Sequence, residues 1–168
     1  WFCGRNDDKS SLGDWWADTK KLPRGLTPLV EACSRNEMEF GLWVEPEMVS
    51  PDSDLYRSHP DWILSHESAP QLLARHQLVL DLARPEVEAY IFDSLSALLS
   101  QHPIRYLKWD MNRDIHQAGN ALGHPAVSGQ TRALYRLLNR VKTAFPEVEI
   151  EGCASGGGRV DCGVLNYV

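Results

Sequence analysis

A lysine and an aspartate, Lys108 and Asp110, follow a short strand-like segment in the middle of the chain. Side chains alternate between the two faces of a strand, so Lys108 and Asp110 share one face and Trp109 takes the other. Reactive groups collect at the carboxyl ends of strands in a parallel barrel, and this pair would then lie among them. The simpler alternative is an ion pair at the end of a strand.

Further polar and aromatic groups follow predicted strands or lie in long loops. Carboxylates, a lysine, an arginine and a tryptophan together suit a sugar, whose hydroxyls need paired hydrogen bonds and whose C–H face needs an aromatic surface. A metal site is less favoured, because Lys108 would repel a cation and no His-x-x-x-His pair occurs. We therefore predict neither metal nor cofactor. The groups are Asp7, Asp8, Trp43, Glu45, Arg75, Asp81, Lys108, Asp110 and Cys153.

The elements that would position these groups alternate between strand and helix. Apolar segments predict strands at 39–45, 77–82, 104–111 and 147–153, and helical spacing predicts helices at 27–36, from Pro85 onward, and at 131–145. At most a short helix is expected near 61–64, and a polar loop is expected at 113–130.

This order predicts an α/β fold with parallel strands and crossover helices, either a doubly wound sheet or about half of an eight-stranded barrel. The barrel is favoured because the strands end in polar residues suited to a shared mouth. In addition, no GxGxxG motif follows the first strand.

Composition limits the function classes. The 168 residues suffice for one domain, and the formal charge of −6, from 17 basic and 23 acidic residues, argues against a nucleic-acid partner. No apolar run approaches the roughly 20 residues of a membrane span. Four scattered cysteines form no CxxC pair, which favours a reducing, intracellular location. The absence of an initial Met suggests a piece of a longer protein.

Seven collinear blocks cover nearly the whole chain and resemble the α-galactosidases of glycoside hydrolase family 36. The first three are WFCGRNDDKSSLGDW (1–15), KLPRGL (21–26) and FGLWVEPEMV (40–49). The others are SHPDW (58–62), ARHQLVLDLARPEV (74–87), KWDMN (108–112) and EGCASGGGRVD (151–161). Several matches of this length in one order make a chance resemblance improbable.

The resemblance implies that residues 1–168 are part of one glycosidase catalytic domain, a (β/α)8 TIM-type barrel of which about half is present. It implies a retaining α-galactosidase with Asp110 as the nucleophile, and Lys108 would help to keep Asp110 ionised and would bind galactose hydroxyls. Asp7 and Asp8 match the carboxylates that hold O4 and O6. The other matched substrate-binding positions are Trp43, Arg75, Asn112 and Cys153.

Each of these residues also has a simpler interpretation. Asp7 and Asp8 could be ordinary turn acids, Trp43 a core residue and Cys153 a small buried thiol. Glu45 and Glu47 are expected to be structural, since the family pattern makes neither catalytic. Cys3 and Cys162 depart from the family pattern, and neither is expected to touch the reacting groups.

A retaining glycosidase needs a second carboxyl group as general acid/base. The resemblance places that residue beyond Val168, so we expect residues 1–168 alone not to hydrolyse an aryl α-galactoside.

The expected substrates are galactoside oligosaccharides such as melibiose and raffinose. α-N-acetylgalactosaminidase or galactosyl-transfer activity, a non-catalytic galactose-binding relic and a metal-dependent sugar isomerase stay open as alternatives. A bacterial cytoplasmic location is favoured over secretion, with no membrane partner. A homo-oligomeric parent enzyme is left open.

Overall fold

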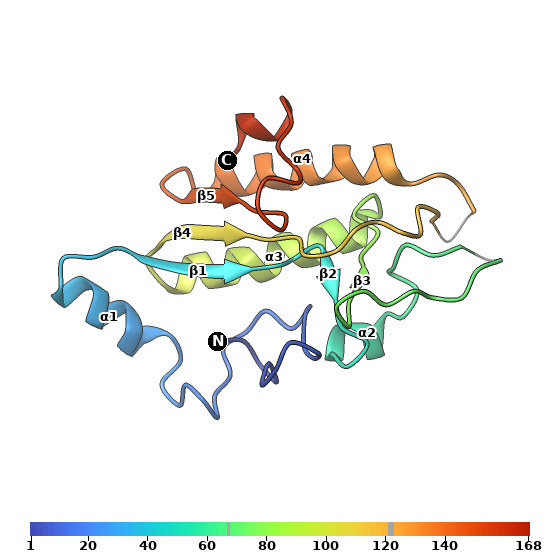
Figure 1. Ribbon diagram of the computed structural model, residues 1–168. Helices are drawn as coiled ribbons and strands as arrows, with labels where there is room; N and C mark the ends of the chain where they lie inside the picture. Colours follow the sequence, from blue (N-terminus) through green and yellow to red (C-terminus); the bar gives the residue numbers. More distant parts are fainter. Residues whose placement is uncertain (67, 121–122) are drawn as a thin grey trace.

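A computed structural model describes residues 1–66, 68–120 and 123–168. Its main element is a parallel sheet with the strand order β1-β4-β5 (Figure 1). These strands are β1 (Phe40–Val44), β4 (Ile104–Trp109) and β5 (Glu149–Gly152). The predicted parallel strands at 39–45, 104–111 and 147–153 are therefore confirmed, each slightly shorter than expected.

Two long helices connect these strands. Helix α3 (Pro85–Gln101) precedes β4, and α4 (Val127–Ala144) lies between β4 and β5. Pro85 in the first turn of α3 has no N–H to leave unpaired, and Glu86 and Glu88 suit the positive end of the helix dipole. The two helices pack against each other beside the sheet (Figure 1). The apolar sides of both are buried in one core with the inward side chains of the strands.

The prediction of a fourth parallel strand at 77–82 is wrong. Within this segment only β3 (Leu78–Val79) is a strand, and it pairs antiparallel with β2 (Met48–Val49) in a separate two-stranded sheet. Asp81 consequently does not end a strand of the parallel sheet. Its Oδ1 accepts the Ala83 N–H at 3.1 Å, just before α3 begins.

Three further predictions need correction. The short helix is α2 (Asp54–Ser58) and not a segment near 61–64, because Ser53 caps it by accepting the Tyr56 N–H. Helix α4 begins at Val127, four residues before the expected start. The expected loop at 113–130 therefore ends earlier, and residues 121–122 within it lie outside the described residues. The remaining elements are α1 (Thr27–Arg35), close to the predicted helix, and a 3-10 turn, η1 (Val164–Asn166).

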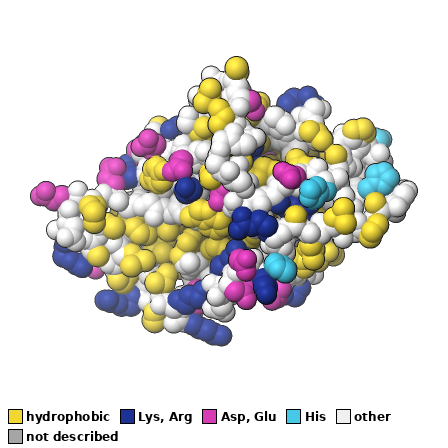
Figure 2. All heavy atoms as spheres, viewed as in Figure 1, with side chains coloured by type: hydrophobic (Ala, Val, Ile, Leu, Met, Phe, Trp, Pro, Cys, Tyr) yellow, Lys and Arg dark blue, Asp and Glu magenta, His cyan; other side chains and the backbone are white. Residues whose placement is uncertain are grey.

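The N-terminal segment covers the side of the molecule below β1 in Figure 1. The Trp15 ring packs against Phe2 at 4.7 Å between centroids, and the Trp1 indole N–H donates to the Trp43 carbonyl at 2.8 Å. Figure 2 shows hydrophobic side chains gathered along β1, next to charged side chains beyond the strand ends. Among the described residues, no helix combines the length and apolar character needed to cross a bilayer.

Candidate active site

The carboxyl ends of the three parallel strands are aligned by their register. Val44, Trp109 and Gly152 lie side by side at the last paired positions. The hydrogen bonding continues one residue further, because the Asp110 N–H donates to the Val44 carbonyl and the Cys153 N–H donates to the Trp109 carbonyl, both at 2.8 Å. The sheet therefore sets Asp110 and Cys153 next to each other.

Asp110 is 6% exposed, and its carboxylate accepts hydrogen bonds from several neutral donors. Oδ2 accepts from the Trp43 indole at 2.9 Å and from the Asn112 amide at 2.6 Å, and Oδ1 accepts from the Met111 N–H at 2.9 Å. Burial alone would raise the pKa of Asp110, but the bonds from Trp43, Asn112, Cys153 and Met111 outweigh it and lower the pKa. Asp110 is therefore held as a carboxylate.

Lys108 has a different role from the one expected for the ionisation of Asp110. Its ammonium lies 3.0 Å from Glu151 Oε1 on the neighbouring strand β5. The neutral donors described above, and not an ion pair with Lys108, account for the lowered pKa of Asp110. Lys108 therefore pairs with Glu151 across the strands, and not with Asp110 at the strand end.

Glu45 follows β1 as Asp110 follows β4, and it is 1% exposed. Its Oε1 accepts the Asn112 N–H at 2.5 Å and its Oε2 accepts from the Gln77 amide at 3.1 Å. Burial, with the nearby charge of Asp110, raises the pKa of Glu45, while the bonds from Asn112 and the charge of Arg75 act in the opposite direction. Glu45 thus joins the loop after Asp110 to the segment that carries Arg75.

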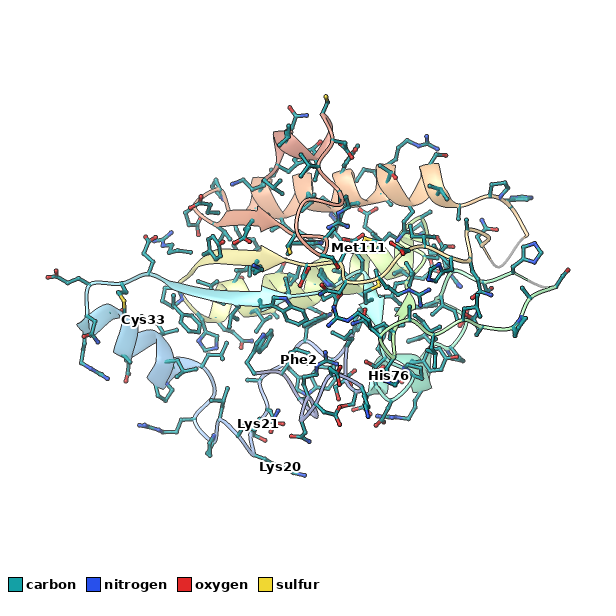
Figure 3. All side chains as sticks on the ribbon, in the orientation of Figure 1. Phe2, Lys20, Lys21, Cys33, His76 and Met111 are labelled. Atoms are coloured by element: carbon teal, nitrogen blue, oxygen red, sulfur yellow. The ribbon has the colours of Figure 1, made fainter. Side chains whose placement is uncertain are left out.

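Arg75 lies at the tip of a tight turn between Ala74 and Gln77. The Gln77 N–H donates to the Ala74 carbonyl at 3.0 Å, and both central residues have positive φ, 53° at Arg75 and 58° at His76. Two positive φ angles define a type I′ turn, which costs free energy for residues other than Gly, Asn or Asp. Figure 3 shows His76 on the side of α2, away from the Met111 end of β4.

Asp7 and Asp8 are exposed in the first loop. Asp7 Oδ1 accepts the Lys9 N–H at 2.8 Å, which is an ordinary Asx turn. Both carboxylates nevertheless act on Arg5. Burial lowers the pKa of Arg5, and the charges of Glu45, Asp8 and Asp7 oppose this lowering only in part. The Arg5 guanidinium donates to the Ser10 carbonyl of the same loop at 2.7 Å, and sequence reasoning did not single this residue out.

Sequence reasoning also missed the partner of Glu47. Arg159, from the glycine-rich segment after β5, contacts the Glu47 carboxylate, which also accepts the Trp109 indole N–H at 2.9 Å. Glu47 is 1% exposed, so this ion pair fixes the glycine-rich segment against the buried end of the sheet. The arginine that ends the SGGGR block and the two acids of the EPE block were the sequence features that could have suggested this ion pair.

A cleft of about 560 Å³ opens beside Asn112, between the segments that follow β4 and β5. Among the described residues, no group of three or more His, Cys, Asp or Glu side chains could hold a metal ion. The cleft is lined by Met111, Asn112, Arg113, Asp114, Ile115, Ala154, Ser155, Gly158 and Arg159.

The fold and the site together define a parallel α/β protein with an ionised carboxylate at the carboxyl ends of its strands. The profile of the Melibiase family matches residues 1–168, and the chain belongs to this family. It is 53% identical over 165 residues to an α-galactosidase of Escherichia coli and 44% identical over 173 residues to α-galactosidase AgaA of Geobacillus stearothermophilus. These matches cover 98% and 100% of the chain.

Solved structures agree with these relatives. The crystal structure of the GH36 α-galactosidase AgaA superposes with a TM-score of 0.95 at 44% identity, and that of the Lactobacillus brevis α-galactosidase with 0.95 at 42% identity. Each match covers 100% of this chain, but only 24% and 23% of the respective structures. The chain spans about a quarter of the length of the relatives it matches.

Proposed function

We propose that this chain is the nucleophile-bearing part of a retaining α-galactosidase and that its three parallel strands belong to one (β/α)8 catalytic barrel. The observation that carries the proposal is the buried, ionised Asp110, which lies at the carboxyl end of the central strand among four hydrogen-bond donors. In a (β/α)8 barrel, this end of the strands is where catalytic groups collect. The α-galactosidase relatives and the matching structures support the same assignment.

In the proposed reaction, an Asp110 oxygen attacks the anomeric carbon of a terminal galactosyl unit. The bond to the leaving oxygen breaks as that oxygen is protonated by a second carboxylic acid, and a galactosyl ester of Asp110 forms. Water then attacks the same carbon with the second carboxylate as base, and Asp110 is released. The two carboxyl groups of a retaining enzyme lie about 5–5.5 Å apart. The resemblance places the second one outside residues 1–168.

Binding of the sugar is proposed to use side chains around Asp110. Trp43, Asn112 and Cys153 bond the Asp110 carboxylate, and these neighbours are proposed to line the sugar site beside it. Lys108 would donate to hydroxyls from the same face of β4. The outer residues Asp7, Asp8 and Arg75 would complete the site. The acids are proposed to accept from O4 and O6, since acceptors at an axial O4 separate galactose from glucose.

The proposed substrates are α-galactosyl oligosaccharides of the raffinose and melibiose type. Variants of the related AgaA have been solved in complex with raffinose and with stachyose, which supports this substrate class. A reducing, cytoplasmic location is proposed because none of the four cysteines forms a disulfide.

The proposal is tested by Asp110→Ala in the complete protein, or in the E. coli α-galactosidase with its matching segment replaced by this chain. Loss of the nucleophile should lower kcat/KM for an aryl α-galactoside by at least about 10³-fold. Added azide should restore part of the turnover, because a small anion can occupy the space of the missing carboxylate.

The matched control is Asp93→Ala, an exposed aspartate on α3, which should leave kcat/KM unchanged. Full activity of Asp110→Ala would overturn the proposal.

A further inference from the structure

Glu151 binds two side chains of the neighbouring strand at once. It lies on β5 opposite Lys108 in the parallel register. Its Oε1 is 3.0 Å from the Lys108 ammonium, and its Oε2 accepts a hydrogen bond from the Tyr106 hydroxyl. Tyr106 and Lys108 are two residues apart on β4, so they share the face of the strand that also leads to Asp110. One carboxylate therefore ties together two successive side chains of this face.

The Tyr106 ring is itself held by the strand on the other side. Gly41 of β1 is paired with Tyr106, and a Cβ at Gly41 would lie only 3.0 Å from both the Cβ and the Cδ1 of Tyr106. The glycine thus leaves room for the ring to pack against β1. Contacts across all three strands consequently fix the position of the Glu151 carboxylate.

The energetics favour orientation over stability as the role of this ion pair. The side chains of Lys108 and Glu151 are 41% and 42% exposed, and an ion pair with that exposure contributes little to folding. A free lysine side chain, in contrast, loses rotamer entropy when it binds a ligand. A lysine already held in place loses less of it on binding.

We propose that Glu151 is a positioning residue that presents the Lys108 ammonium to a hydroxyl of the bound galactosyl unit. This inference rests on the proposed function, in which Lys108 binds substrate. The ammonium has three N–H donors, and Glu151 engages it from the β5 side, which leaves donors for the sugar. Glu151 acts through Lys108 and does not itself touch the substrate.

Glu151→Gln in the complete protein, or in the chimaera described above, removes the negative charge and keeps the shape of the side chain. We expect KM for an aryl α-galactoside to rise about five- to tenfold with kcat changed less than about twofold, because the lysine contact is made in ground state and transition state alike. The matched control is Glu149→Gln, an exposed glutamate two residues earlier on the same face of β5, which should leave KM unchanged.

A double-mutant cycle separates this role from a general structural one. In a Lys108→Met background, Glu151→Gln should add nothing to KM, because the residue through which it acts is gone. Additive effects, or a Glu151→Gln enzyme with unchanged KM, would overturn the inference. If Glu151→Gln does not fold, Tyr106→Phe removes only the second partner of the carboxylate, and a smaller rise in KM is expected.

Calorimetry of galactose binding tests the same contact without turnover when the Asp110→Ala variant is compared with and without Glu151→Gln. Glu151→Gln should weaken galactose binding about five- to tenfold in that variant. Unchanged binding would overturn the inference even if the proposed catalytic role of Asp110 stands. Weakened binding would support it even if the catalytic role of Asp110 fails.

Discussion

Two regions carry the carboxylates of the proposed site, and they are built differently. Asp110 is 6% exposed at the end of a central strand, with its carboxylate surrounded by donors from three segments. Asp7 and Asp8 are exposed in the first loop, where the Asp7 carboxylate bonds only the local turn among the hydrogen bonds found in the described residues. The proposed nucleophile is therefore preorganised by the sheet, while the acids proposed to recognise the sugar depend on the position of a loop.

The difference has a physical cause in the way each segment is held. Parallel hydrogen bonding fixes the backbone of Asp110 against the strands on both sides. The first loop is anchored at its base by aromatic packing and by the Ser11 N–H, which donates to the Asp52 carbonyl at 2.7 Å. Nearer its tip, the Arg5 guanidinium donates to the Ser10 carbonyl of the same loop at 2.7 Å. We infer that reaction chemistry and sugar recognition can be altered separately.

Substitutions of the loop acids test directly whether sugar recognition can be altered without the reaction chemistry, and their expected effect on KM is the largest. Asp7→Asn and Asp8→Asn should each raise KM for an aryl α-galactoside about 10- to 100-fold, since each replaces a charged acceptor of sugar hydroxyls. The preference for galactosides over glucosides should fall, because an acceptor for the axial O4 is lost. Steady-state kinetics with both aryl glycosides measures both effects.

The control is Asp52→Asn, an exposed aspartate beside the base of the same loop whose carboxylate pairs with Arg57. It should leave KM unchanged. The comparison breaks if Asp8→Asn lowers kcat as strongly as Asp110→Ala while KM stays constant, because the loop would then take part in the chemistry.

A smaller effect is expected from the donors around Asp110. The hydrogen bond from the Cys153 thiol is one of those that lower the pKa of Asp110, so Cys153→Ala should raise that pKa. An aspartate whose pKa is lowered in the folded state contributes its full stabilisation at pH values above its unfolded pKa. The ionised carboxylate and this stabilisation are lost as pH falls through the folded pKa. The acidic limb of the kcat/KM profile should therefore move to higher pH, with less than about a tenfold loss at neutral pH.

A pH profile of the Cys153→Ala enzyme, with Cys33→Ala on the distant helix α1 as control, checks this expectation. An acidic limb that stays in place, or moves to lower pH, would mean that the thiol does not hold the carboxylate in its ionised form.

The smallest effect is expected in helix α4. Gly129→Ala adds a Cβ that meets only Ala83, at an ordinary contact distance of 3.6 Å, in the first turns of α4. Alanine is the better helix former, so the free energy of unfolding should rise by about 0.5–1 kcal/mol. Thermal unfolding measures the gain, and kcat/KM should not change. A loss of activity in this variant would show that the site is coupled to α4 more tightly than the structure suggests.

The sequence predicted the parts of the fold in which local pattern and tertiary structure agree. Pro85, the acids after it and the helical spacing identified α3, and the segment before Lys108 identified β4. The segment 77–82 was misassigned because a short apolar run does not distinguish a parallel strand from a strand of a small antiparallel pair. The pairing of Leu78 with Val49 depends on contacts that local pattern does not encode.

The candidate site shows the same division. The strand-end positions of Asp110 and Cys153 followed from the alternation of strands and helices. The cause of the lowered pKa did not, because Lys108 is closer to Asp110 in sequence than the donors Trp43 and Cys153. Glu151 and Arg5 were overlooked for a related reason, since their importance arises from partners on other strands and loops. Spacing along one strand reveals neither.

The measurement that tests the account most directly is trapping of the covalent intermediate in the complete protein with a mechanism-based fluorinated galactoside. Peptide mass spectrometry should find one galactosyl label, attached to Asp110, and Asp110→Ala should abolish it. A label on Asp7, Asp8, Glu45 or any other side chain would contradict the assignment of Asp110 as the nucleophile.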